Sequence, residues 1–347
     1  MTFFKVSKLS IVNCQLSIVL LISLFLISCH NNPVEEKVQL IELKIETERF
    51  DTALFEIKPE NTLAALPALG AKYGKFFDIY CRNVIRISSP DSNIFANNLK
   101  QFITDPDMRS AYEDSRKLYP DLNFLNVQLS EAFKHYKYYF PDSIIPKVIA
   151  NISGFNYAVI TTDSVLAVGL EMYLGEHSRF YEMLGLPQYK LNNMRREYMA
   201  VDCIKGWAGS SFEEPMLKDD LLSDMIVQGR ILYFTDAMLP DMPDSLKTGF
   251  KQKQLEWCRD NEANCWAFII EKKLLYSNDP GTATKIMKEG PFTQGMSHDS
   301  PGRLGEWLGW QLVKAYMKNN PSVDLKALMV EKDAQKVLTL SKYKPRK

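Results

Sequence analysis

The chain has 347 residues, of which 42 are basic and 42 are acidic, so its formal net charge is zero. Apolar residues make up 46% of it, which is an ordinary share for a globular protein and enough for a sizeable core. The balanced charges, without a long run of either sign, exclude the basic surface that binds nucleic acid, and no nucleic-acid partner is expected.

The N-terminus carries a targeting signal. Lys5 and Lys8 precede an apolar run over residues 16–27, and the run ends in Leu26-Ile27-Ser28-Cys29. This ending matches a bacterial lipobox, so we predict a lipoprotein signal peptide over residues 1–28 and a lipid anchor with palmitate-type acyl chains on Cys29. The alternatives are a plain signal peptide or an anchor helix, but the run is short for a membrane span of about 20 residues. A membrane, bound through the acyl chains, is therefore the first predicted partner.

Four cysteines follow this segment. They are Cys81, Cys203, Cys258 and Cys265. The envelope permits disulfides, but Cys258 and Cys265 are seven positions apart in a helix-like stretch. Seven residues of helix measure about 10 Å, which exceeds the reach of a disulfide. We predict that these two cysteines are unpaired and buried, while the pairing of Cys81 with Cys203 stays open. No Cys or His spacing predicts a metal cage.

Residues 29–38 are polar, and they predict a short flexible tether ahead of a single domain over residues 39–347. At the start of this domain, residues 40–45 alternate apolar and polar side chains, which predicts a strand that is buried on one face. Helices alone are predicted over residues 59–142. They are expected at residues 62–86, at 94–104 with Ser92 as cap, at 106–118 and at 127–140.

The middle of the chain predicts the rest of a small sheet. Residues 147–152 form an apolar run between prolines, which is typical of a buried strand. Residues 157–161 and 165–168 are rich in β-branched and aromatic side chains, and the turn-forming Thr162-Asp163 lies between them. These two runs predict a β-hairpin.

The remaining segments predict helices. Apolar residues at spacings of three and four predict a helix over residues 192–207. Further helices are expected from 221 to just before Leu239, twice between 245 and 276, and at 302–318. Ser300-Pro301 is expected to cap and begin the last of these, where Gly305 and Gly309 would let another element approach closely. The predicted fold class is therefore α+β, a mostly helical domain with a small β-sheet.

The helix over residues 192–207 raises the possibility of a zinc peptidase. Such enzymes need two histidines one turn apart with a glutamate between them, HExxH. Here Glu197 occupies the position of the glutamate, but Arg196 and Ala200 occupy the two ligand positions, and neither binds zinc. A site built from Asp202 and the distant His177 has no further support. We predict that Glu197 and Asp202 lie on a solvated helix face or pair with the neighbouring Arg195 and Arg196.

Two other histidines are candidate site residues. His135 lies among aromatic residues at helical spacing, which favours a place at the edge of a packed helix. His298 lies in the polar loop TQGMSHDSPG, where it is a site candidate without a partner. The sequence has no GxSxG motif and no phosphate-binding glycine loop. Its tryptophans and tyrosines could line a glycan or peptide groove, but their helical spacing favours the core.

Several segments together resemble one known family. They are the lipobox, RFDTALF at 49–55, GFNYAVITTDSVLAVGLEMYLG at 154–175, LGLPQY at 184–189, LLSDMIVQGRILYFTDAMLPD at 221–241 and SPGRLGEWLGWQLVKAYM at 300–317. In this order, and over nearly the whole mature chain, they resemble the gliding-motility lipoprotein GldB family of Bacteroidetes. That family is similar in turn to predicted zinc peptidases, in which the helix corresponding to residues 192–207 carries HExxH and a later helix carries a glutamate before a glycine. This chain has Gln228-Gly229 at the latter place. The resemblance therefore implies a degenerate zincin-like metallopeptidase scaffold that lacks its metal ligands.

The resemblance implies a periplasm-facing membrane lipoprotein of a Gram-negative envelope, in the inner or the outer membrane, with protein partners in the gliding motility and type IX secretion apparatus. We predict that it is not an enzyme but a pseudopeptidase, with no catalytic residues, no metal and no cofactor. Cys29, as the lipidation site, is the one functional residue that the resemblance carries over. Two alternatives stay open, a periplasmic glycan- or peptide-binding lipoprotein and a metallopeptidase with atypical ligands.

Overall fold

The computed structural model describes residues 33–90 and 94–346. The chain divides into two compact units, Met1–Glu42 and Leu43–Lys347. In the first unit, helix α2 (Pro33–Gln39) takes up part of the predicted tether, and its proline start and acidic first turn favour a helix there. The predicted signal peptide, Cys29 and the Ser92 cap lie outside the described residues. No helix in the described part of the chain is long and apolar enough to cross a membrane.

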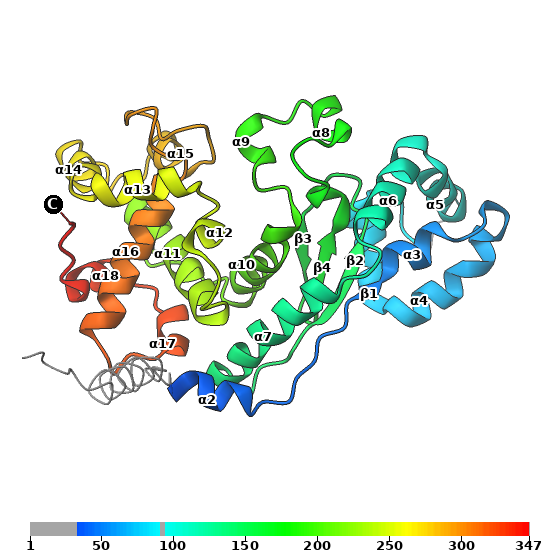
Figure 1. The fold of residues 1–347 in the computed structure, drawn as a ribbon, viewed down its shortest axis with the longest axis horizontal. Helices are drawn as coiled ribbons and strands as arrows, with labels where there is room; N and C mark the ends of the chain where they lie inside the picture. Colours follow the sequence, from blue (N-terminus) through cyan, green and yellow to red (C-terminus); the bar gives the residue numbers. More distant parts are fainter. Residues whose placement is uncertain (1–32, 91–93, 347) are drawn as a thin grey trace, which may run out of the picture. The chain divides into compact units, whose positions relative to one another are not determined.

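The second unit contains a four-stranded mixed sheet (Figure 1). Its strands are β1 (Glu48–Arg49), β2 (Lys147–Asn151), β3 (Val159–Thr161) and β4 (Val165–Gly169), in the order β1-β2-β4-β3. β1, β2 and β4 run parallel, and β3 pairs antiparallel with β4. The predicted strand at 147–152 and the predicted hairpin are confirmed.

The strand predicted at residues 40–45 is wrong, because this segment has no strand partner in the described structure. The backbone amide of Ile45 donates instead to the hydroxyl of Ser130, and the amide of Thr47 donates to the side chain of Asn126, at 2.9 and 3.0 Å. Both acceptors lie on α7 (Asn123–Tyr139). Side chains of a helix therefore satisfy the donors that a neighbouring strand would have bound.

Four predicted helices are confirmed in the N-terminal part of this unit, although α7 begins four residues before the predicted start, and one short helix, α3 (Phe50–Phe55), was not predicted. The confirmed helices are α4 (Thr62–Ile79) with the π-turn η2 (Tyr80–Val84), α5 (Phe95–Thr104), α6 (Pro106–Leu118) and α7. α6 begins at the predicted residue, because Asp105 accepts from the amides of Asp107 and Met108 and Pro106 occupies the first turn.

The helix predicted over residues 192–207 begins seven residues later. Arg195 is extended, with φ −147° and ψ 160°, and forms an isolated bridge with Leu174. A 3-10 turn η4 (Arg196–Tyr198) follows, and only then α10 (Met199–Ser211). The segment between β4 and η4 contains the turn η3 (Leu170–Tyr173) and the short helices α8 (Arg179–Met183) and α9 (Gln188–Leu191). The pairing of Arg195 with a distant segment thus overrides the local helical pattern.

The C-terminal part is helical, as predicted. It contains α11 (Leu221–Met238), α12 (Asp244–Thr248), α13 (Gln252–Asp260), α14 (Glu262–Glu271), α15 (Pro280–Met287), α16 (Leu304–Asn319), α17 (Leu325–Met329) and α18 (Ala334–Ser341). The predicted cap of α16 is wrong. Arg303, in the left-handed conformation with φ 58°, precedes this helix, whereas the hydroxyl of Ser300 accepts from the amide of Thr293 and donates to the carbonyl of Ser297.

α11 and α16 pack with their backbones in contact at Gly229 and Gly309. A Cβ atom placed on Gly309 would overlap the carbonyl of Met225, and one on Gly229 would overlap the carbonyl of Gly309. The close approach that the sequence predicted at Gly309 is confirmed, and it brings the two longest C-terminal helices together.

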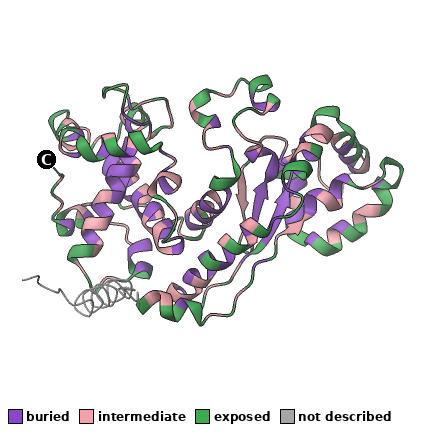
Figure 2. Ribbon diagram, viewed as in Figure 1, coloured by how far each residue is buried: buried purple, intermediate pink, exposed green. Residues whose placement is uncertain are grey.

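The core of this unit is rich in aromatic side chains. Figure 2 shows that strands β2 and β4 are largely buried. Trp207, Trp307 and Trp310 are buried, which confirms that these tryptophans pack at helical spacing. The four described cysteines are free and buried. The prediction for Cys258 and Cys265 is confirmed, although Asn261 separates their helices α13 and α14.

Candidate functional site

The two carboxylates predicted on one helix face lie in different environments. Glu197 is in η4, is exposed and faces Arg195, with 3.9 Å between its carboxylate and the guanidinium, so the prediction of a solvated carboxylate is confirmed for it. Arg196 instead places its guanidinium 4.1 Å from the ring centre of Phe124. Asp202 lies in the first turn of α10 and points into the protein, which contradicts the solvated face and the pairing with Arg195 or Arg196.

Asp202 lines a cavity of about 230 Å³ between α10 and the segment that leads into α16. Tyr173, at the end of η3, donates a hydrogen bond from its hydroxyl to the Asp202 carboxylate over 2.9 Å. Burial raises the pKa of Asp202 above its ordinary value, although Lys205, Tyr173 and Arg303 oppose this shift. The cavity therefore contains a carboxylate that is partly removed from water and faces basic side chains.

Lys205 lines the same cavity, one helical turn after Asp202. Residues three apart on a helix share a face, so α10 presents an acid and a base side by side. Burial, and then the positive charge of Arg303, lower the pKa of Lys205 to about 8. Its ammonium group makes no hydrogen bond or ion pair with the described residues. Lys205 is therefore a cation whose hydrogen bonds are uncommitted.

Arg303 is held firmly on the opposite wall. Its guanidinium donates to the carbonyl of Thr248 at 3.1 Å and to the carboxylate of Glu306 at 3.3 Å, and it lies 5.7 Å from the ring centre of Phe250. Burial raises the pKa of Glu306, while Arg303 opposes this shift. Gly249 is required beside it, because φ is +73° and a Cβ atom would lie 2.8 Å from the Arg303 guanidinium.

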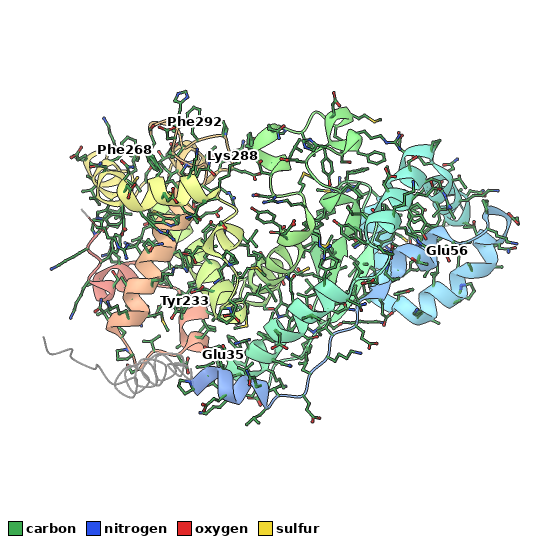
Figure 3. All side chains as sticks on the ribbon, viewed as in Figure 1. Glu35, Glu56, Tyr233, Phe268, Lys288 and Phe292 are labelled. Atoms are coloured by element: carbon green, nitrogen blue, oxygen red, sulfur yellow. The ribbon has the colours of Figure 1, made fainter. Side chains whose placement is uncertain are left out.

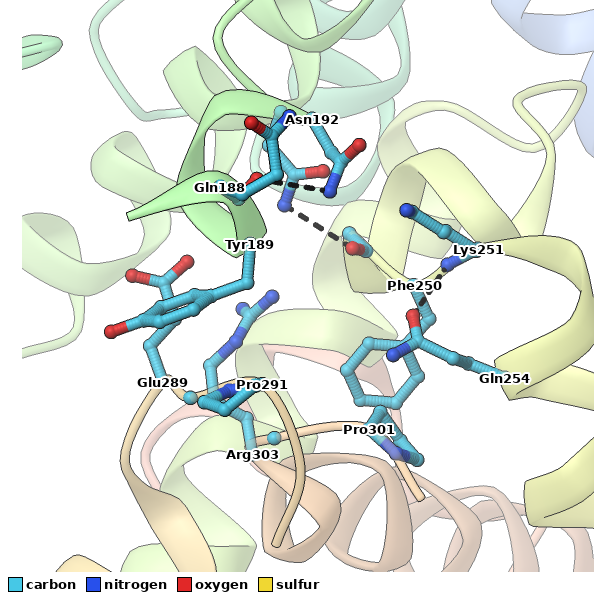
Figure 4. A pocket seen from close by; sticks show the side chains of 14 residues that line it. Gln188, Tyr189, Asn192, Phe250, Lys251, Gln254, Glu289, Pro291, Pro301 and Arg303 are labelled. Atoms are coloured by element: carbon cyan, nitrogen blue, oxygen red, sulfur yellow. Dashed lines mark hydrogen bonds between the residues drawn. The ribbon is translucent and has the colours of Figure 1, made fainter. Parts of the chain in front are cut away.

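A second hollow of about 240 Å³ adjoins the first. The two hollows share Asn193, Gly249, Glu289 and Arg303 as lining residues, and we call them together the α10 groove. In the second hollow, Tyr189 and Glu289 lie on one side and Phe250 and Gln254 on the other, with Arg303 between them (Figure 4). The groove is thus charged at its α10 end and rich in amide side chains at the other.

None of the described histidines lines this groove. His135 is buried on α7, and its Nδ1 lies 2.9 Å from the carbonyl of Glu131, which confirms its place in a packed helix. His298 is exposed and stacks on Phe292, with ring centres 4.2 Å apart; Figure 3 labels Phe292. His177 is exposed beside Glu176. In residues 33–90 and 94–346, no group of three His, Cys, Asp or Glu side chains is placed to hold a metal ion.

A buried carboxylate that the sequence did not reveal lies at the carboxyl end of the sheet. Glu171, two residues after β4, accepts hydrogen bonds from the amides of Ser153 and Phe155 and from the Ser153 hydroxyl. Burial raises the pKa of Glu171 to about 7, although these hydrogen bonds lower it. The carboxylate holds the loop after β2, in which Gly154 and Phe155 both have positive φ. We interpret Glu171 as a structural residue of that loop.

Lys205 and Arg303 are the site residues that sequence reasoning missed. A lysine on an apolar helix face, three positions after an aspartate, was the available signal for Lys205. Arg303 follows a glycine in a segment that the sequence predicts as the start of a helix, and its left-handed conformation, with φ 58°, departs from that pattern.

Comparison with known proteins identifies a family. The family model described as gliding motility protein GldB matches residues 31–345. No curated protein matches the chain, and no solved structure matches it. The matched range contains every residue of the α10 groove and begins two residues after Cys29.

Proposed function

The chain belongs to the family of gliding motility protein GldB, a family of lipoproteins, and from this membership we propose that it is a lipid-anchored envelope protein that supports gliding motility and type IX secretion without catalysing a reaction. The family match over residues 31–345 is the observation that carries the proposal. Its partners would be proteins of the motility or secretion apparatus. Cys29, after the signal peptide of residues 1–28, would carry the acyl chains.

The contents of the groove support the non-enzymatic part of this proposal. On α10, Asp202 and Lys205 line the cavity, and in the window Val201 to Lys205 they take the second and fifth positions, a register five residues later than the one centred on Glu197. In an HExxH motif these positions hold the general base and a zinc-binding histidine. An ammonium group has no lone pair for a metal, and Val201 has no ligand atom. A degenerate zincin-like scaffold, whose metal position is occupied by a lysine, would account for this window.

The direct test is genetic. Deletion of the gene in the source bacterium should abolish colony spreading and reduce the secretion of type IX cargo. Expression of the Asp202→Asn variant should restore both, because an isosteric change of a non-catalytic residue keeps the fold. If Asp202→Asn abolished both activities while the folded protein accumulated normally, the non-enzymatic proposal would fail.

A second candidate function is a periplasmic binding lipoprotein, and one observation favours it. The α10 groove is a polar hollow that contains the ammonium group of Lys205. This group makes no hydrogen bond or ion pair with the described residues, so it is available to bind a ligand. Such a role is compatible with the family membership, since a motility or secretion protein can also recognise an envelope component.

A further inference from the structure

We propose that the α10 groove binds an acidic oligosaccharide, in which the carboxylate of a uronic acid pairs with Lys205 and sugar hydroxyls bind the amide side chains of the outer hollow. This inference rests on the second candidate function. It is independent of the anchor at Cys29 and of the motility role, so its failure would leave both standing.

The charges that line the groove favour an anion. Four lining residues are basic and two are acidic: Lys190, Lys205, Lys251 and Arg303 against Asp202 and Glu289. Two of these charges already face each other, since the Lys190 ammonium lies 3.7 Å from the Glu289 carboxylate. Glu306, which does not line the groove, forms an ion pair with Arg303 and neutralises its charge. The remaining charges leave the groove net positive, and low-dielectric walls strengthen its attraction for a carboxylate.

Lys205 is the residue best suited to hold that carboxylate. The Arg303 guanidinium, the Asp202 carboxylate and the Glu289 carboxylate all have a partner, through Glu306, Tyr173 and Lys190. The ammonium of Lys205 makes no hydrogen bond or ion pair with the described residues, although the charges of Asp202 and Glu306 act on it, and it lines the cavity. A carboxylate placed there would compensate for the burial of this cation, and a charge-assisted hydrogen bond in such a site is stronger than a neutral one.

The outer hollow supplies the groups that recognise sugars. Its lining includes the amide side chains of Gln188, Asn192, Asn193 and Gln254, each of which offers a donor and an acceptor. A pair of vicinal hydroxyls presents the same combination. The ring of Tyr189 lies along one side (Figure 4). The apolar face of a pyranose would pack on this ring, while the hydroxyls at the rim of the sugar form hydrogen bonds.

A peptide fits this groove less well. Extended peptides are usually recognised by an open strand edge or by apolar pockets for alternate side chains. The lining residues of the outer hollow lie on helices and loops. The residues among them without a polar side-chain group are Phe250, which Arg303 covers, two prolines and three glycines, namely Pro291, Pro301, Gly249, Gly290 and Gly302. Neither mode of peptide recognition is provided there.

The test is calorimetric titration of the full lipoprotein in detergent with trigalacturonate, with maltotriose and trialanine as the neutral-sugar and peptide probes. Trigalacturonate should bind, and maltotriose should bind at least tenfold more weakly. Lys205→Gln should weaken trigalacturonate binding at least tenfold. Lys332→Gln, which removes an exposed lysine that pairs with Glu214 outside the groove, should leave it unchanged.

The pH dependence separates a direct role of Lys205 from a structural one. The titratable or charged groups that line the cavity with Lys205 are Tyr173, Lys190, Tyr198, Asp202, Glu289 and Arg303, and Glu306 on α16 also acts on its charge. With a Lys205 pKa of about 8, binding should be about tenfold weaker at pH 9 than at pH 7. Lys205→Arg should bind at pH 7 and lose this dependence, because a guanidinium stays charged across that range.

Three results would overturn the inference: no binding of trigalacturonate, equal binding of maltotriose, or binding of trialanine in place of either sugar. If Lys205→Gln did not fold, as judged by its thermal melt, the pH profile of Lys205→Arg would decide alone. A profile identical to that of the natural protein would show that Lys205 does not hold the ligand.

Discussion

The hydroxyl of Tyr173 and the carboxylate of Asp202 lie 2.9 Å apart and join the turn after β4 to the first turn of α10. Tyr173 is buried, and burial together with Asp202 raises the pKa of its phenol well above the ordinary value, so the hydroxyl remains a donor. This bond fixes the carboxylate at the wall of the groove.

Removal of that donor should therefore cost stability. Tyr173→Phe leaves a partly buried carboxylate without its donor, and we expect a loss of about 1–3 kcal/mol in the free energy of unfolding. Urea unfolding at pH 7 measures it. Tyr189→Phe, whose hydroxyl makes no hydrogen bond with the described residues, is the control and should change little. Equal stability of Tyr173→Phe and the natural protein would contradict the assigned bond.

Glu171 should make stability depend on pH. Its folded-state pKa of about 7 lies above the ordinary glutamate value, so the folded protein holds this proton more tightly than the unfolded chain does. The stabilising contribution is complete below the unfolded pKa of about 4.3 and is lost as the pH rises through 7. Urea midpoints measured from pH 4 to 8 should therefore fall relative to those of Glu171→Gln.

Glu171→Gln is informative because the three donors from Ser153 and Phe155 all reach one oxygen of the side chain, and a carboxamide keeps that oxygen. The exposed Glu197→Gln should reproduce the profile of the natural protein. Parallel profiles of the natural protein and Glu171→Gln would rule out the assigned titration.

The contact between α11 and α16 should not tolerate a side chain. Gly309→Ala forces a Cβ atom onto the carbonyl of Met225, so the helices must separate, and we expect a loss of about 3 kcal/mol or more. Gly209→Ala on α10 is the matched control. No atom lies within 4 Å of its added Cβ, and alanine favours a helix by about 0.5–1 kcal/mol, so this variant should be as stable as the natural protein or more so. Thermal unfolding of both variants checks the difference.

The lipid anchor should depend on Cys29. Cys29→Ala should shift the protein from the membrane fraction to the soluble fraction, because the covalent attachment site of the acyl chains is gone. Immunoblots of fractionated cells measure this. The matched control is Cys81→Ala, which changes a buried cysteine and should leave the protein in the membrane fraction. Unchanged fractionation of Cys29→Ala would exclude the lipobox interpretation.

The purified protein should contain no stoichiometric zinc. The groove presents Lys205 and Arg303 where a metal would need neutral or anionic ligands, and such charges repel a divalent cation. Elemental analysis and a melting curve with and without a chelator measure this. Zinc at one equivalent per chain together with cleavage of a casein substrate would reverse the conclusion.

The sequence predicted the fold best where one local signal determines the outcome. Asp105-Pro106 caps α6 whatever surrounds it, and Thr162-Asp163 turns the hairpin between two apolar runs. It failed where a distant partner competes with the local pattern. Residues 40–45 have the alternation of a strand, but hydroxyl and amide side chains on α7 take the donors at Ile45 and Thr47. The bridge between Leu174 and Arg195 likewise delays the start of α10.

The site was predicted less well, for a physical reason. The sequence places the carboxylate of Asp202 on a helix, yet which helix face is solvated depends on the segment that covers it. The segment that covers this face, with Arg303, follows about a hundred residues later in the chain. Periodicity along one helix does not contain that information. Neither the uncommitted Lys205 nor the left-handed Arg303 could have been assigned without the tertiary structure.

The bonds that close the groove have a consequence for when it forms. Asn193 donates to the carbonyl of Gly249 across 56 residues, and Arg303 donates to the carbonyl of Thr248 across 55. A chain that crosses the membrane from its N-terminus would expose α10 long before the segment carrying Arg303 follows. The groove therefore forms only late in translocation. A ligand that contacts both walls would bind the completed protein and would not bind a partly translocated chain.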